Sequence, residues 1–137
     1  MEIKDSAECT YCYNIDSIEH HLFYCKNARQ LWKDIYNLLN SIFKPNLENP
    51  GVCEIIFGVH IDKPYPPETY CRNLVILFGK WYINHTRSES KDLNFPEFCS
   101  ILKQKVDIYL TNFKCPKSLE RVDRSIKNSL KMLLNKI

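Results

Sequence analysis

A mostly α-helical fold is predicted by three features of this 137-residue sequence. Apolar residues recur at steps of three and four over four long segments, which is the spacing of one buried helix face. Prolines, glycines and asparagines gather between these segments, where they end helices. The length is typical of one domain, and hydrophobic residues make up 45% of the chain, enough for a packed core. We therefore expect one compact helical unit.

The first long helix is expected over residues 17 to 43. Asp16 followed by Glu19 is typical of an N-cap with a carboxylate three residues further on. The apolar positions that share one face of this helix are Leu22, Ala28, Leu31, Trp32, Ile35, Leu38, Leu39 and Ile42. Prolines and a glycine follow, so residues 44 to 66 are expected to form a loop with one short extended or helical piece.

Two further helices are expected in the middle of the chain. Residues 68 to 87 are apolar nearly all round, which predicts a helix buried on most sides, with Leu77, Phe78 and Trp81 in the core. Truncation of Leu77 or Phe78 to alanine is then expected to destabilise the fold by about 2 to 5 kcal/mol. Pro96 suits the first turn of the next helix, which carries apolar residues as far as Phe113.

The last helix is expected to begin after Pro116 and Ser118 and to be amphipathic. Its apolar residues fall on one face and five cations on the other, namely Lys117, Arg121, Arg124, Lys127 and Lys131. Residues 114 to 137 have a net charge of +5, whereas the first 25 residues have one lysine against five acids. The cationic face is either an ordinary solvated helix face or a surface for nucleic-acid phosphates.

Cysteines and histidines cluster near the N-terminus. Cys9, Cys12 and Cys25 accompany His20 and His21, and four more cysteines lie far apart downstream. The sequence has no membrane span and no secretory leader, so we expect an intracellular protein, cytoplasmic or nuclear. In that reducing environment, an odd number of cysteines with a C-x2-C pair favours metal binding over disulfides.

A tetrahedral zinc site explains this cluster better than buried thiols do. Three thiolates and one imidazole would fill the coordination shell of Zn²⁺ and leave no position for water, which is typical of a structural metal. Spacing alone leaves the histidine open. On an uninterrupted helix His21 lies four residues before Cys25 on the same face, whereas His20 as the ligand requires an irregular start of the helix.

The motif Cys9-x-x-Cys12, Asp16-Ser-Ile-Glu-His20, Leu22-Phe23, Cys25 and Trp32 resembles the zinc-binding C-terminal domain of LINE-type, non-LTR retrotransposon reverse transcriptases. This resemblance implies a CCHC zinc knuckle with the ligands Cys9, Cys12, His20 and Cys25. It also implies an accessory role in binding RNA or single-stranded DNA, as the C-terminal part of a reverse transcriptase polypeptide or of a gene derived from one. The knuckle and the start of the first helix would occupy residues 1 to 32, and residues 33 to 137 would complete the same structural unit.

Neither polymerase nor endonuclease motifs occur in the chain, so we expect a non-catalytic module without a membrane or small-molecule partner. Tyr11 and Tyr13 flank the C-x2-C turn and are candidates for stacking on bases, while Trp32 and Trp81 are expected in the core. The four separate cysteines, namely Cys53, Cys71, Cys99 and Cys115, are expected to be buried thiols. The alternative function is a protein–protein interaction module with a purely structural zinc site.

Overall fold

The computed structural model describes residues 17–43, 51–57, 67–112 and 120–137, and every regular element in these ranges is helical. In chain order they are a short π-helix η1 (His20–Tyr24) and the α-helices α1 (Lys26–Ile42), α2 (Val52–Phe57), α3 (Pro67–Ser88), α4 (Phe95–Asn112) and α5 (Glu120–Lys136). The prediction of a mostly α fold is confirmed. Cys9, Tyr11, Cys12, Tyr13 and Asp16 lie outside the described residues.

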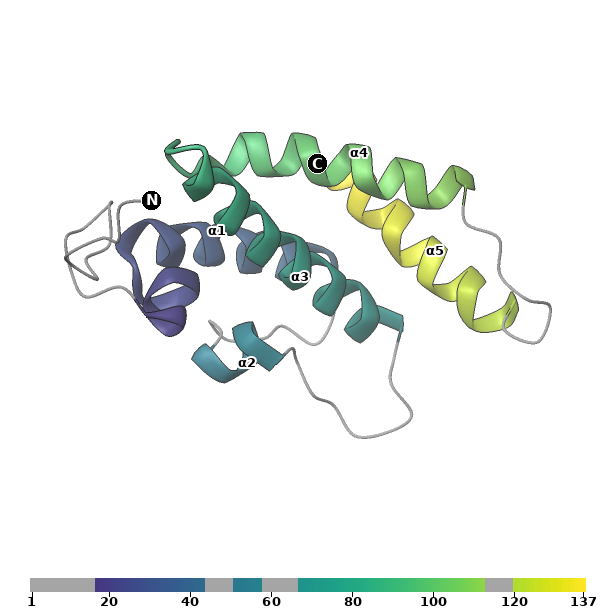
Figure 1. Ribbon diagram of the computed structural model, residues 1–137. Helices are drawn as coiled ribbons and strands as arrows, with labels where there is room; N and C mark the ends of the chain where they lie inside the picture. Colours follow the sequence, from purple (N-terminus) through teal and green to yellow (C-terminus); the bar gives the residue numbers. More distant parts are fainter. Residues whose placement is uncertain (1–16, 44–50, 58–66, 113–119) are drawn as a thin grey trace.

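Helix α3 is the centre of the assembly. It packs against α1, α4, α5 and η1, and α5 also lies against α1 and α4. In Figure 1, α3 passes in front of α1, while α4 runs along the upper edge of the molecule. The short helix α2 sits beside η1, at the end of the fold that carries the candidate metal ligands.

The apolar stripe predicted for the first helix forms much of the core. The side chains of Leu31, Trp32, Ile35 and Leu39 are almost completely buried, and they meet buried residues of every other long helix. A buried arginine, Arg72 of α3, closes the C-terminal end of this helix by donating hydrogen bonds to the Phe43 carbonyl (3.2 Å) and the Asn40 side chain (3.4 Å). The bond to Phe43 satisfies a backbone carbonyl at the helix end, where no helical partner is available.

One prediction about α3 is wrong. Leu77 is 58% exposed and Trp81 is 43% exposed, although the apolar composition of the segment placed both in the core. The buried side of α3 instead includes Val75, Ile76 and Ile83. Leu77 and Trp81 lie one turn apart and both remain exposed, so truncation of Leu77 opens no core cavity and the large loss of stability predicted for it does not apply.

The separate cysteines differ in their surroundings. Cys71 is fully buried and Cys99 is half-buried, but Cys53 is exposed, so the prediction of buried thiols is wrong for Cys53. Cys115 lies outside the described residues. Among the helices in the described ranges, none combines the length and the hydropathy that crossing a membrane requires.

Candidate metal centre and the neighbouring groove

The chain enters α1 through an irregular turn. Ser17 begins it, because its side-chain oxygen accepts a hydrogen bond from the His20 N–H (3.1 Å) and its carbonyl accepts one from the His21 N–H (2.7 Å). The backbone then forms the π-helical turn η1, closed by a hydrogen bond from the Cys25 N–H to the His20 carbonyl (2.8 Å). Cys25 itself is non-helical, with ψ at 135°, and its carbonyl accepts the first hydrogen bond of α1 from Arg29.

This turn buries the two predicted ligands that lie in the described residues. His20 is 8% exposed and Cys25 is 1% exposed, and they stand at the two ends of one hydrogen-bonded turn. A π-turn contains one more residue than an α-turn, so it brings residues five apart into the relation that residues four apart have on an α-helix. The irregular helix start that His20 required is therefore present.

His21 is engaged with a different element. Its Nδ1 atom forms a close hydrogen bond with the Arg87 guanidinium near the C-terminal end of α3, and Arg87 Nη1 also reaches the His21 carbonyl at 3.4 Å. A guanidinium can only donate, so His21 Nδ1 is the acceptor. One of the two ring nitrogens of His21 is thus already used in holding η1 to α3.

The remaining predicted ligands, Cys9 and Cys12, lie outside the described residues. Within the described residues, no three His, Cys, Asp or Glu side chains gather closely enough to hold a metal ion. The described part of the chain therefore contributes His20 and Cys25 to the predicted set.

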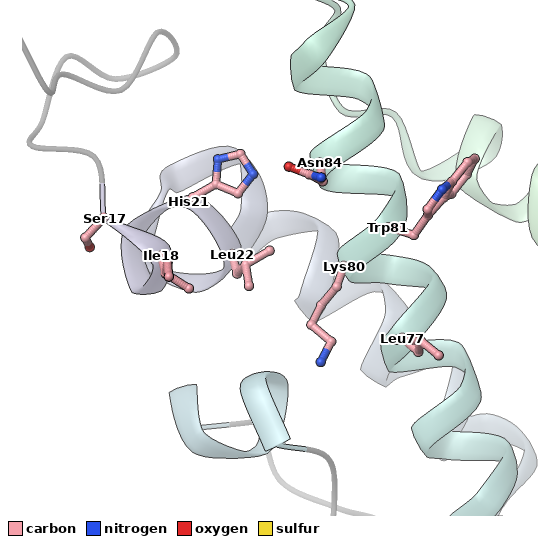
Figure 2. A pocket seen from close by; sticks show the side chains of 8 residues that line it. All are labelled: Ser17, Ile18, His21, Leu22, Leu77, Lys80, Trp81 and Asn84. Atoms are coloured by element: carbon pink, nitrogen blue, oxygen red, sulfur yellow. The ribbon is translucent and has the colours of Figure 1, made fainter.

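A groove of about 760 Å³ lies between parts of η1 and α3. Ser17, Ile18, His21 and Leu22 line one wall, and Leu77, Lys80, Trp81 and Asn84 line the other (Figure 2). The lining is largely apolar, and the part of the chain that the structure describes contributes no carboxylate to it. The ammonium of Lys80 donates a hydrogen bond to the Ile56 carbonyl (3.0 Å), which ties α2 to the same groove.

An aromatic stack stands beside this groove. The indole of Trp81 and the imidazole of His85 lie parallel within 8°, with their centroids 4.8 Å apart. The ammonium of Lys105 from α4 lies 5.8 Å from the centroid of the indole, and His85 Nε2 is 3.3 Å from a Glu89 carboxylate oxygen. This cluster was not predicted, because the apolar sequence around Trp81 indicated a core position for its side chain. The four-residue spacing of Trp81 and His85, which places both side chains on one helix face, could have indicated the stack.

The structure describes the cationic face of α5 from Arg124 onward. Arg124 and Lys131 are exposed, and Lys127 is half-buried. The apolar residues Leu130 and Leu133 of the same helix are fully buried, so the predicted division into two faces is confirmed over this stretch. Lys117 and the side chain of Arg121 lie outside the described residues.

Comparisons of the chain with protein-family models, with curated proteins and with solved structures found no match.

Proposed function

We propose that this chain is a zinc-stabilised helical module that binds RNA or single-stranded DNA. It would serve as the C-terminal part of a non-LTR retrotransposon reverse transcriptase, or of a protein derived from one. The observation that carries the proposal is the π-turn between His20 and Cys25. The family motif places its ligands at this unusual five-residue spacing, and the turn buries both of these side chains.

The residues that would hold Zn²⁺ are Cys9, Cys12, His20 and Cys25. Thiolate and imidazole are the ligands that Zn²⁺ prefers, and four of them leave no open position for a substrate or a water molecule. The metal would fix the N-terminal segment against η1 and contribute to folding rather than to a reaction. The engagement of His21 with Arg87 supports His20 as the histidine ligand.

Nucleic acid would be met mainly by the cationic side of the module. The first 25 residues are acidic, and three thiolates around Zn²⁺ would add about one further negative charge there. The exposed Arg124 and Lys131 belong instead to a C-terminal segment with a net charge of +5. Phosphate contacts from such residues provide the sequence-independent part of the binding energy.

A salt titration tests this proposal. Binding of a fluorescein-labelled 12-nucleotide single strand is followed by anisotropy at several salt concentrations, with the full chain loaded with zinc. Each phosphate contact contributes about 0.7 to the logarithmic salt slope on a single strand. We expect the double variant Arg124→Gln, Lys131→Gln to bind more weakly and with a smaller slope than the wild type.

A matched variant controls for net charge. Arg29→Gln, Lys33→Gln removes two exposed cations from α1 and should bind more tightly than the α5 variant. Equal loss in both variants would mean that only the overall charge matters, and absence of salt-sensitive binding by the wild type would contradict the proposal.

A protein–protein interaction module is the second candidate function. It is favoured by the apolar side chains that line the groove and remain exposed, which are Ile18, Leu77 and Trp81. Large apolar side chains gathered at a surface are typical of sites that bind other proteins. If the single strand does not bind at any salt concentration, this candidate takes the place of the first.

A further inference from the structure

The stack of Trp81 on His85 presents an aromatic surface where none was expected. Trp81 is 43% exposed, and the parallel imidazole of His85 supports one face of its ring. The hydrogen bond or ion pair between His85 and Glu89 holds that imidazole at its edge, so the indole has a defined orientation. A flat, oriented and partly exposed indole is a suitable surface for stacking a nucleobase.

The adjoining groove holds a hydrogen-bonding amide that is directed away from this aromatic surface. Asn84 lies on α3 close to Trp81, and Figure 2 shows its side-chain amide directed across the groove toward His21. Asn84 is exposed, and its amide forms no hydrogen bond with the other residues that the structure describes. An amide carries both a donor and an acceptor, and this one faces the groove rather than the indole, which points to the other side of α3 in Figure 2.

The charges around the groove favour an anionic ligand. None of the described residues that line it carries a carboxylate, and with histidine neutral the one formal charge among them is the ammonium of Lys80. Lys105 adds a second ammonium at the rim, where it lies over the indole ring. Because Lys105 is exposed and its stem is flexible, it can move from the ring to a phosphate when a base takes its place.

We propose that Trp81 forms a stacking subsite for one unpaired nucleobase of a bound single strand, with Lys105 positioned for the adjacent phosphate. This inference rests on the proposed function, since it names where that strand would be held. This subsite lies where Lys105 of α4 approaches α3, and it uses none of the cations of α5. A strand would therefore be contacted at two places, by stacking at Trp81 and by charge at α5.

A protein partner is the competing occupant of this groove. An apolar segment docking there would use Leu77 as much as Trp81, because both are exposed apolar side chains of the same groove wall. A stacked base depends on the flat ring alone. Truncation of Leu77 should therefore weaken binding of a protein segment but not of a base, whereas truncation of Trp81 should weaken binding of both.

The test uses the zinc-loaded full chain and two labelled 12-nucleotide strands, one of adenosines and one abasic. Trp81→Ala should weaken binding of the adenosine strand about tenfold, because stacking on one aromatic ring contributes about 1 to 3 kcal/mol per base. Trp81→Tyr should restore most of the affinity, and Leu77→Ala should bind within about threefold of the wild type. The abasic strand should bind equally to wild type and Trp81→Ala.

Fluorescence provides a readout that does not depend on a variant. The chain has two tryptophans, and Trp32 is 1% exposed, so quenching by a bound base reports on Trp81. We expect the adenosine strand to quench the wild-type emission and the abasic strand to leave it unchanged. Circular dichroism confirms that each variant retains the fold.

The possible failures are distinguishable. No binding of either strand by the wild type would refute the proposed function together with this subsite. Binding without quenching, and with equal affinity for Trp81→Ala, would refute the subsite alone. An equal loss in Trp81→Ala and Leu77→Ala would also refute it and would identify the groove as an apolar docking surface for a protein.

Discussion

The indole ring of Trp32 lies directly against the backbone of Gly79. A Cβ atom at position 79 would come within 2.6 Å of Trp32 Cη2 and 2.7 Å of Cζ3, which is closer than such atoms can approach. Glycine therefore allows α3 to cross α1 with the largest core side chain between them. The pairing also explains why a helix tolerates a glycine near its middle, where alanine would be favoured by about 1 kcal/mol.

Replacement of Gly79 by alanine should destabilise the protein. Overpacking of a filled core contributes about 1 to 3 kcal/mol, and better helix propensity offsets about 1 kcal/mol of this. We expect a net loss of up to about 2 kcal/mol in chemical denaturation. In a Trp32→Phe background, which removes the outer ring carbons, Gly79→Ala should have no such effect. An equal effect in both backgrounds would show that the two residues are not coupled.

Zinc binding should depend on His20 and Cys25 but not on His21. We expect native mass spectrometry with metal analysis to find one Zn²⁺ per chain, lost or strongly weakened in His20→Ala and Cys25→Ala. His21→Ala should retain the metal, because His21 is directed to Arg87. A chain without bound zinc, or a greater loss in His21→Ala than in His20→Ala, would contradict the predicted ligand set.

Two buried tyrosines should respond in opposite ways to removal of their hydroxyl groups. The Tyr36 hydroxyl is buried and forms no hydrogen bond within the described residues. The Tyr82 hydroxyl accepts a hydrogen bond from the Asn94 N–H (3.0 Å) and can donate to the Asn94 carbonyl or Glu97. Tyr82→Phe should therefore lower the free energy of unfolding by about 1 kcal/mol, whereas Tyr36→Phe should leave it unchanged or raise it. Urea denaturation at pH 7 measures both, and a comparable loss in the two variants would count against this assignment.

Alkaline pH should destabilise the wild type through Tyr36. Burial, followed by the charge of Glu54, raises the pKa of this hydroxyl from 10 to about 12, although Arg72 acts in the opposite direction. The unfolded chain therefore loses the proton first, and the stability present below pH 10 is lost as the pH rises toward 12. Between pH 9 and 11.5 the wild type should lose about 2 kcal/mol relative to Tyr36→Phe. Parallel stability curves for the two proteins would rule out this contribution.

The helices were predictable because their signals are local. The apolar stripe of α1 and the prolines near the starts of α3 and α4 mark these elements within a few residues. The exposure of Leu77 and Trp81 was not predictable, because apolar composition does not tell which sides of a helix have neighbours. Composition also could not show that the Arg87 side chain would reach His21, since the two residues lie 66 positions apart.

The candidate site was predictable only in outline. Residue types and spacing indicate zinc, but the choice between two adjacent histidines depends on one backbone hydrogen bond. That bond forms between His20 and Cys25. The carbonyl that accepts this hydrogen bond depends on how η1 packs against α3. A local sequence pattern does not determine that packing.

The contact between Arg87 and the His21 carbonyl also bears on the backbone register of η1. In an ordinary α-helix the Cys25 N–H would bond to that same carbonyl, and His21 would take the place that His20 now has. Arg87 Nη1 lies 3.4 Å from this oxygen, and the Cys25 N–H pairs instead with the His20 carbonyl, one residue earlier in the chain. The sequence thus has two helical registers available, separated by a single hydrogen bond. A side chain from the far end of α3 favours the longer turn and, with it, the histidine that faces inward.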